Sequence, residues 1–190
     1  LEIILSDDCS SDRTYQIMQE MAAAYEGPHE VKVRRNEVNL GLAGHINVLM
    51  NQAKGEIIFW AAGDDISMPH RVEVLSKPML VDSNVTGVHS SMVEIDLHGK
   101  ALRRRSHKPR TTNVTVQSII YEGGAVATQT LGFRKSIFDH FGPLLSTLTN
   151  EAAPLAFRTC VKGKVIYFFE PSVWYRVGSG TSTFKAGDIN

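Results

Sequence analysis

Two apolar segments of this chain each end in a pair of aspartates. The pairs are Asp7 and Asp8 after residues 1–6, and Asp64 and Asp65 after residues 56–62. Short apolar runs of this kind are typical of buried central strands in a parallel sheet, and a helical pattern follows each run. Ligands of open α/β sheets bind outside the carboxyl ends of the strands, so we expect the four carboxylates to face one crevice.

The remaining hydrophobic pattern predicts an α/β fold with a mostly parallel central sheet flanked by helices. Polar capping residues open the expected helices, and glycine or proline closes them. Helices are expected over residues 13–25, 46–53, 114–121, 136–141 and 151–161, with another beginning at Pro69. Further strands are expected over residues 29–35, 86–96, 130–134, 164–169 and 172–176, with a hairpin turn at 97–100.

Length and composition limit the class of protein. With 190 residues and no linker-like segment, the chain is expected to form a single domain around one core. The 20 basic and 20 acidic side chains cancel, which argues against a protein that coats nucleic acid. No apolar run approaches the roughly 20 residues that a membrane-spanning helix needs. Cys9 and Cys160 are too few for a disulfide framework, so we expect a reducing, cytoplasmic setting.

The clustered aspartates predict a cation site. Carboxylates repel one another unless a cation or a hydrogen-bonding ligand compensates their charge. Mg²⁺ and Mn²⁺ prefer such oxygen ligands, commonly together with phosphate oxygens. The alternative is that an aspartate caps a helix or forms a turn, and we favour that role for Asp12. For Asp64 and Asp65, directly after a strongly apolar strand, we favour metal binding.

A series of short motifs extends along nearly the whole chain. They are residues 3–14 (IILSDDCSSDRT), Asn39-Leu40-Gly41, Asn47, residues 53–56 (AKGE), Gly63-Asp64-Asp65 with Pro69 and Arg71, Gly132-Phe133-Arg134, residues 141–143, residues 151–158 and Tyr175-Arg176. In this order and spacing they resemble the family-2 glycosyltransferases, which have the Rossmann-like GT-A fold. The resemblance implies transfer of a sugar from a nucleotide-diphosphosugar to an acceptor hydroxyl.

The resemblance also implies roles for individual residues. Asp8 would contact the nucleotide base, with Asp7 and Asn47 in the same nucleotide-sugar site. Asp65, with help from Asp64, would reach the ribose and a divalent metal, Mn²⁺ or Mg²⁺, that neutralises the leaving diphosphate.

By the same resemblance, residues 1–100 would form the nucleotide-sugar and metal half of the domain, and residues 101–190 the acceptor half. Arg176 is either a diphosphate partner or a surface arginine at a strand end, and both interpretations stay open. The donor is expected to be a UDP- or GDP-sugar. The acceptor is expected to be a saccharide or a lipid-linked molecule in bacterial polysaccharide or cell-surface glycan synthesis.

An inverting transfer needs a base that takes the proton of the acceptor hydroxyl. In relatives this is commonly the aspartate of a Glu-Asp pair, six positions before an arginine. Here Glu151 and Arg158 are present, but Ala152 stands at the aspartate position. Three explanations compete: Glu151 is the base, Ala152 is an inactivating substitution, or the domain is a catalytically silent sugar-nucleotide binder. We favour one of the first two.

Two further features depart from the pattern of many relatives. Where those relatives have a histidine, this chain has Gly178, at the start of a Gly/Ser/Thr-rich segment over residues 178–182. That segment would hold phosphate through backbone N–H groups or close over the ligand as a lid, and we favour the lid. The chain also starts at Leu1 inside an expected strand, so we expect the first strand, with its Pro-x-Tyr/Phe-Asn-like motif, to be missing.

A basic cluster follows the predicted hairpin in an expected loop. It comprises Arg103, Arg104, Arg105, His107, Lys108 and Arg110. Such a loop would attract a phosphorylated or lipid-linked acceptor at the inner face of the membrane and give peripheral association, or it is a solvated surface, which we favour. Gly123, Gly124, Thr128 and Gln129 lie where the resemblance places an acceptor-facing loop.

A receiver domain of bacterial response regulators is a rival interpretation, because residues 65–69 are similar to its Asp-x-x-Met-Pro motif. A receiver also needs a later Ser/Thr, which Ser90 or Ser91 would supply, and a Lys-Pro near a fifth strand. Lys-Pro occurs at residues 77–78 and 108–109, and neither position fits. We therefore favour a metal-dependent glycosyltransferase.

Overall fold

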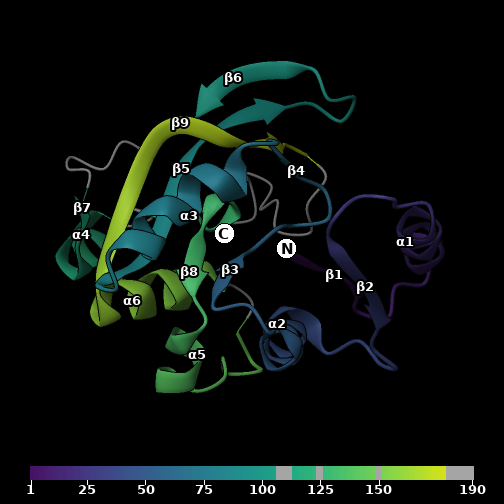
Figure 1. Ribbon diagram of the computed structural model, residues 1–190, viewed down its shortest axis with the longest axis horizontal. Helices are drawn as coiled ribbons and strands as arrows, with labels where there is room; N and C mark the ends of the chain where they lie inside the picture. Colours follow the sequence, from purple (N-terminus) through teal and green to yellow (C-terminus); the bar gives the residue numbers. More distant parts are fainter. Residues whose placement is uncertain (106–112, 123–125, 149–150, 179–190) are drawn as a thin grey trace, which may run out of the picture. The chain divides into compact units, whose positions relative to one another are not determined.

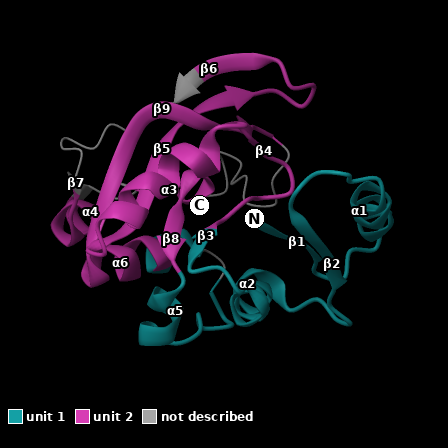
Figure 2. Ribbon diagram, in the orientation of Figure 1, with its two compact units in different colours: residues 1–58, 135–154 teal, residues 59–134, 155–190 magenta. Residues whose placement is uncertain are grey.

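The computed structural model describes residues 1–105, 113–122, 126–148 and 151–178. The chain divides into two compact units (Figure 2). Unit 1 comprises residues 1–58 and 135–154, and unit 2 comprises residues 59–134 and 155–190. Each unit is therefore built from two separate stretches of the sequence.

Unit 1 begins with a β-α-β segment. Its elements are β1 (Glu2–Asp7), α1 (Thr14–Ala23), β2 (Glu30–Arg35), α2 (Gly41–Gln52) and α5 (Ser136–Phe141) (Figure 1). β1 and β2 form a two-stranded parallel sheet, because α1 carries the chain back to the start of the next strand. Their register joins Glu2 to Glu30 and Asp7 to Arg35. The side chains that follow β1 and β2 therefore leave the sheet at the same edge.

Unit 2 contains most of a seven-stranded sheet. Its elements are β3 (Ile57–Phe59, which begins in unit 1), β4 (Ile66–Ser67), α3 (Arg71–Val81), β5 (Val85–Ile95), β6 (Ala101–Arg105), β7 (Asn113–Val114), α4 (Val116–Glu122), η1 (Thr128–Thr130), β8 (Gly132–Arg134), α6 (Ala152–Lys162, which also begins in unit 1) and β9 (Lys164–Arg176). The strand order is β3-β8-β5-β9-β4, with β6 beside β5 and β7 beside β9. The core of unit 2 includes fully buried side chains such as Leu75, Val88, Leu131, Phe133 and Val165.

The expectation of a single, mostly parallel sheet is wrong. The strands divide between two sheets, and the larger one is mixed. In that sheet β5 pairs with β9 in parallel, but its pairs with β6 and β8 are antiparallel, as are the pairs of β9 with β4 and β7. The β5–β6 pair is antiparallel because a tight turn at Gly99, with φ +84°, returns the chain directly beside β5. Local hydrophobic pattern predicts strands but does not fix their direction.

The closing strands also differ from the expected ones. The structure has one long strand, β9, where the sequence predicts two. Its register against β5 shifts between Ser90 and Met92, which lie opposite Phe168 and Val173. Pro171 lies in this irregular stretch, where its missing N–H removes no ladder bond. The serine hydroxyls that the receiver interpretation required are buried here and bond the irregular stretch, Ser90 to the Ser172 hydroxyl and Ser91 to the Phe169 carbonyl.

Three boundaries differ locally. Helix α2 begins at Gly41 rather than residue 46, because Asn39 Oδ1 accepts the Gly41 N–H and allows an earlier start. The strand expected over residues 56–62 is limited to β3. The first part of the expected basic loop forms β6 instead, because it pairs with β5. Within the described ranges, no helix is both long and apolar enough to cross a bilayer.

Candidate functional site

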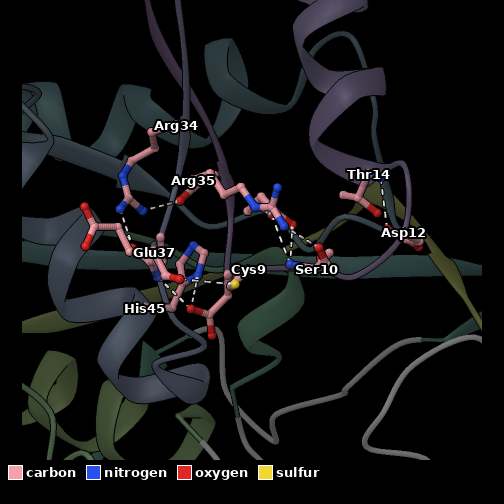
Figure 3. Close-up of polar contacts among 12 residues, drawn as sticks. Cys9, Ser10, Asp12, Thr14, Arg34, Arg35, Glu37 and His45 are labelled. Atoms are coloured by element: carbon pink, nitrogen blue, oxygen red, sulfur yellow. Dashed lines mark hydrogen bonds and ion pairs between the residues drawn. The ribbon is translucent and has the colours of Figure 1, made fainter.

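Asp8 lies directly after β1 in unit 1, and the described residues contact its side chain at one carboxylate oxygen. Oδ1 accepts hydrogen bonds from the Leu40 N–H (2.9 Å) and from Asn36 Nδ2 (2.6 Å). The Nδ1 atom of His45, which is labelled in Figure 3, lies 3.4 Å from the same oxygen. Partial burial alone would raise the pKa of Asp8, but the hydrogen bonds from Leu40 and Asn36 and the nearby His45 bring it below its usual value of 3.8. The carboxylate is therefore ionised at neutral pH. The described residues leave Oδ2 available to a ligand.

Asp7 has a different environment. It is 3% exposed, and its carboxylate accepts the Ser10 N–H and forms an ion pair with Arg35 Nε at 3.1 Å. Arg35 also donates to the Ser10 carbonyl over 2.6 Å. These contacts fix the turn at Cys9, whose φ of +64° is unusual for a residue other than glycine. The geometry gives Asp7 a structural role in the turn, and its expected part in nucleotide binding stays a prediction.

Asn47 is also engaged within unit 1. Its Nδ2 donates to the Leu144 carbonyl and its Oδ1 accepts the Leu144 N–H, both over 2.8 Å. This paired contact holds the segment after α5 to helix α2. Its amide is therefore committed to the backbone, and contact with a nucleotide sugar stays a prediction.

Asp64 and Asp65 lie in unit 2, in the short loop between β3 and β4. Asp65 Oδ1 accepts the backbone N–H of Arg176 over 2.9 Å. Burial raises the pKa of Asp65 above its usual value of 3.8; the Arg176 hydrogen bond opposes the rise, and the charge of Asp64 adds to it. A bound cation would offset both the burial and the repulsion.

The side chain of Arg176 holds the same loop. Its Nε donates to the Asp64 carbonyl over 2.9 Å, and its Nη1 donates to the carbonyls of Asp96 and Leu97 over 3.0 Å. The guanidinium thus ties the aspartate loop to the turn between β5 and β6. This positioning role was not among the interpretations of Arg176 that the sequence offered. Contact with a diphosphate stays a prediction.

Arg71, the first residue of α3, holds both ends of the aspartate loop. It is 2% exposed and donates to the Ser67 hydroxyl (2.8 Å), the Trp60 carbonyl (2.6 Å) and the Gln129 carbonyl (3.1 Å). Trp60 and Ser67 flank the aspartate loop in the sequence, so one guanidinium joins both of its ends. Burial lowers the pKa of Arg71 to about 10, and the charge of Asp65 partly offsets this effect.

The donor set of this loop fits a divalent metal that also binds phosphate. Mg²⁺ is usually bound in proteins by one or two carboxylates together with substrate phosphates and water, and Mn²⁺ accepts similar oxygen ligands. Asp64 and Asp65 supply two carboxylates. Among the described residues no group of three or more His, Cys, Asp or Glu side chains is placed to hold a metal by itself. A metal here would take its remaining ligands from outside the described residues, as phosphate oxygens or water.

The expected catalytic base lies at the start of α6. Glu151 immediately precedes the helix and is partly exposed, and Ala152 is its first residue. The alanine methyl group cannot accept a proton. Arg158 lies farther along the helix, and burial lowers its pKa. The three explanations for Ala152 therefore remain predictions.

The acceptor residues are only partly described. In the basic cluster, Arg103 forms an ion pair with Glu94 at 2.5 Å; residues 106–112 lie outside the described residues, as do Gly123 and Gly124. Thr128 and Gln129 form part of η1. Gly178 has a φ of +87°, a conformation that favours glycine, and residues 179–182 lie outside the described residues.

Sequence reasoning assigned no site role to Asn36, His45 or Arg71. Their contacts with Asp8 or around the aspartate loop depend on the folded chain, and no local motif announces them. Alternation along β2 is the one usable signal, since it places Arg34 and Asn36 on the same side of the strand.

The sequence matches a known family over most of its length. The profile of Glycosyl transferase family 2 matches residues 1–142. An uncharacterized glycosyltransferase of Nostoc sp. is 23% identical over 171 residues, which are 88% of this chain and 49% of that protein. Poly(ribitol-phosphate) beta-N-acetylglucosaminyltransferase TarS of Staphylococcus aureus is 37% identical over 65 residues, which are 34% of this chain and 11% of TarS. The chain thus spans less than half the length of these relatives.

The fold agrees with this family. The crystal structure of S. aureus TarS 1–349 in complex with UDP-GlcNAc matches with a TM-score of 0.69 and 20% identity, covering 94% of this chain and 50% of that one. A likeness at this identity shows the α/β fold that the two chains share. The receiver-domain interpretation is wrong, because the family match includes the residues on which it rested. This chain belongs to Glycosyl transferase family 2.

Proposed function

We propose that this chain transfers a sugar from a UDP-sugar to an acceptor hydroxyl, with inversion and with the help of a divalent metal. The observation that carries the proposal is the ionised Asp8, whose Oδ2 is left available by the described residues. A carboxylate binds a ligand N–H strongly. Uracil and guanine have a ring N–H on their pairing edge, whereas cytosine and adenine have a ring acceptor there. The similarity to the fold of TarS with UDP-GlcNAc supports the choice of uridine.

Asp64 and Asp65 would hold the divalent metal, Mn²⁺ or Mg²⁺, which supplies charge neutralisation for the departing diphosphate. Arg71 and Arg176 fix the loop that carries these two carboxylates. We place the nucleotide-sugar and metal contacts mainly in residues 1–100 and the acceptor contacts in residues 101–190, with Arg176 as the exception. The acceptor would be a saccharide or a lipid-linked molecule in bacterial glycan synthesis.

Glu151 would take the proton of the acceptor hydroxyl as the oxygen attacks the anomeric carbon. A second candidate function is sugar-nucleotide binding without turnover, and Ala152 is the observation that favours it, because its side chain is not ionisable. The two functions share the nucleotide site and differ in whether the sugar is released from UDP.

Calorimetric titration with UDP, GDP, CDP and ADP, each with and without Mn²⁺, tests the shared site. We expect UDP to bind with metal, and CDP and ADP to bind at least about tenfold more weakly, since one charged hydrogen bond is lost. Asp8→Ala and Asp65→Ala should each weaken UDP binding. Asp139→Ala, a change at an exposed aspartate of α5, is the matched control. Equal affinity of all four nucleotides would contradict the assignment of Asp8.

A further inference from the structure

We propose that Asn36 is a positioning residue for Asp8, oriented by Arg34, an inference that rests on the proposed nucleotide site. Asn36 directly follows β2 and is 6% exposed. Its backbone N–H donates to the Asp7 carbonyl over 2.9 Å and so continues the β1–β2 ladder. Its Nδ2 donates to Asp8 Oδ1 over 2.6 Å. Asp8 is therefore tied to the neighbouring strand through a side chain that is itself fixed.

The direction of the Asn36 amide follows from its second partner. Arg34, labelled in Figure 3, donates from Nη2 to Asn36 Oδ1 and from Nη1 to the Ser6 hydroxyl, the latter over 2.6 Å. A guanidinium has donors only, so the amide oxygen must face Arg34. The NH₂ group must then face Asp8. Rotation of the amide by 180° would break both contacts, because each would pair two donors or two acceptors.

Strand alternation separates this chain of contacts from the neighbouring ion pair. In β1 and β2, Ser6 lies opposite Arg34, and Asp7 lies opposite Arg35. Side chains two residues apart on a strand share a face. One face of the strands therefore carries the series of hydrogen bonds that links Ser6, Arg34, Asn36 and Asp8. The Asp7–Arg35 ion pair lies on the other face. One aspartate of the pair stabilises the turn, and the other is kept ready for a ligand.

Polar, charged and titratable groups surround Oδ1 of Asp8. Asn36 and the Leu40 N–H donate to Oδ1, His45 lies beside the same oxygen, and Arg34 acts through Asn36. With Oδ1 occupied, the orientation of the carboxylate is fixed and Oδ2 faces no described donor. A ligand N–H then meets an oxygen that requires no rearrangement, which raises affinity by preorganisation.

The test replaces the amide NH₂ group of Asn36 by an oxygen atom. In Asn36→Asp the side chain keeps its size and its contact with Arg34, but it loses the donor to Asp8 and places a second carboxylate beside it. UDP affinity in saturating Mn²⁺ should fall about tenfold at pH 7.5 relative to the unchanged chain. At pH 5.5 the two carboxylates can share a proton, which restores a donor to Oδ1, so the difference in affinity should narrow to about threefold or less.

Asn51→Asp makes the same chemical change at an exposed position of α2 and is expected to leave UDP affinity unchanged at both pH values. Unchanged affinity in Asn36→Asp, or a loss that is equally large at pH 5.5, would overturn the positioning role while leaving the nucleotide site intact. If the unchanged chain binds neither UDP nor GDP, the proposed function fails and this inference fails with it. Should Asn36→Asp not fold by circular dichroism, Arg34→Met removes the donor to Asn36 Oδ1 and frees the amide. Full UDP affinity in that variant would overturn the proposal.

Discussion

The backbone N–H of Arg176 donates a hydrogen bond to Oδ1 of Asp65, although the two residues are 111 positions apart in the chain. The end of β9 is thereby joined to the loop that carries the proposed metal ligands. The Arg176 side chain reaches the same loop through Asp64. The last strand of the described fold thus fixes a loop that lies in the first half of the sequence.

Arg176→Lys should raise the Mn²⁺ concentration that UDP binding requires, with only a modest loss in the free energy of unfolding. Lysine keeps the charge but cannot donate to the Asp64, Asp96 and Leu97 carbonyls at once. We expect the free energy of unfolding to fall by about 1–2 kcal/mol. The Mn²⁺ concentration needed for half-maximal UDP binding should rise several-fold. Calorimetry over a Mn²⁺ series and urea unfolding measure the two effects, and an unchanged Mn²⁺ requirement would contradict the positioning role of Arg176.

Arg71→Met should be strongly destabilising. It leaves the Trp60 and Gln129 carbonyls and the Ser67 hydroxyl without their buried donor. We expect a loss of about 3 kcal/mol in the free energy of unfolding, measured in urea. Arg13→Met, at an exposed arginine with a surface ion pair to Glu20, should change it by about 0.5 kcal/mol or less. If the two variants lost similar amounts of unfolding free energy, the buried hydrogen bonds of Arg71 would not be the source of its contribution to stability.

Gly163→Ala tests how the turn between α6 and β9 packs against the start of β5. A Cβ atom at this position would lie 2.4 Å from the Asn84 carbonyl oxygen and 2.6 Å from Thr86 Cγ2. The backbone must shift to relieve the first contact, so we expect a loss of about 2 kcal/mol in thermal or urea unfolding. At Gly55 the nearest atom would be 3.5 Å away, an ordinary contact, and Gly55→Ala should be close to neutral. A neutral Gly163→Ala would contradict the described packing.

The ion pair between Glu2 and Lys32 predicts how stability changes in acid. The Lys32 hydrogen bond lowers the pKa of Glu2 below its usual value of 4.5, and the Lys54 N–H acts in the same direction. Because the folded pKa is lower than the unfolded one, this contribution is fully present above about pH 4.5 and is lost as the pH falls through the folded pKa. Glu2→Gln should remove that part of the acid dependence. Urea unfolding at pH 6, 4.5 and 3.5 measures the free energy of unfolding of both proteins. If its pH dependence is the same in Glu2→Gln and in the unchanged chain, Glu2 makes no such contribution.

Introducing an aspartate at position 152 tests which residue is the base. If Ala152 is an inactivating change, Ala152→Asp should raise release of UDP from a UDP-sugar by about 10²-fold or more in the presence of acceptor. Ala153→Asp places the same charge at the next, exposed position and should have no such effect. If Glu151 is the base, the unchanged chain should already turn over, and Glu151→Gln should abolish this activity. No turnover in any of these proteins, with UDP still bound, would favour the silent binding domain.

Elements with a strong local pattern were predictable from the sequence. The β1-α1-β2 segment lies within a few residues of its predicted bounds, and the β5–β6 hairpin turn is confirmed. The pairing of β5 with β9 was not predictable in this way, because the residues that meet, such as His89 and Tyr167, are distant in the chain. Hydrophobic period identifies which face of a strand is buried, but it carries no information on which strand lies beside it.

The candidate site shows the same limit. Asp8, Asp64 and Asp65 were identified because they follow apolar strands, a local signal. The contacts that distinguish Asp7 from Asp8 come from β2 and could not be read from the Asp-Asp pair itself. Arg71 belongs to one of the short motifs, but its role is not apparent from the sequence, because an arginine in a helix is usually exposed and only the folded chain reveals its burial.

The division of each unit between two stretches of the chain has a consequence for synthesis. Unit 1 needs residues 135–154 to be complete, and unit 2 needs β9, which ends at Arg176. When residues 1–134 have been translated, the nascent chain therefore contains most of both units, but neither unit can complete its fold. Because the β5–β9 pair forms only after its last strand has been made, the chain must delay its central pairing until late in translation, and slow, concerted folding is the expected result.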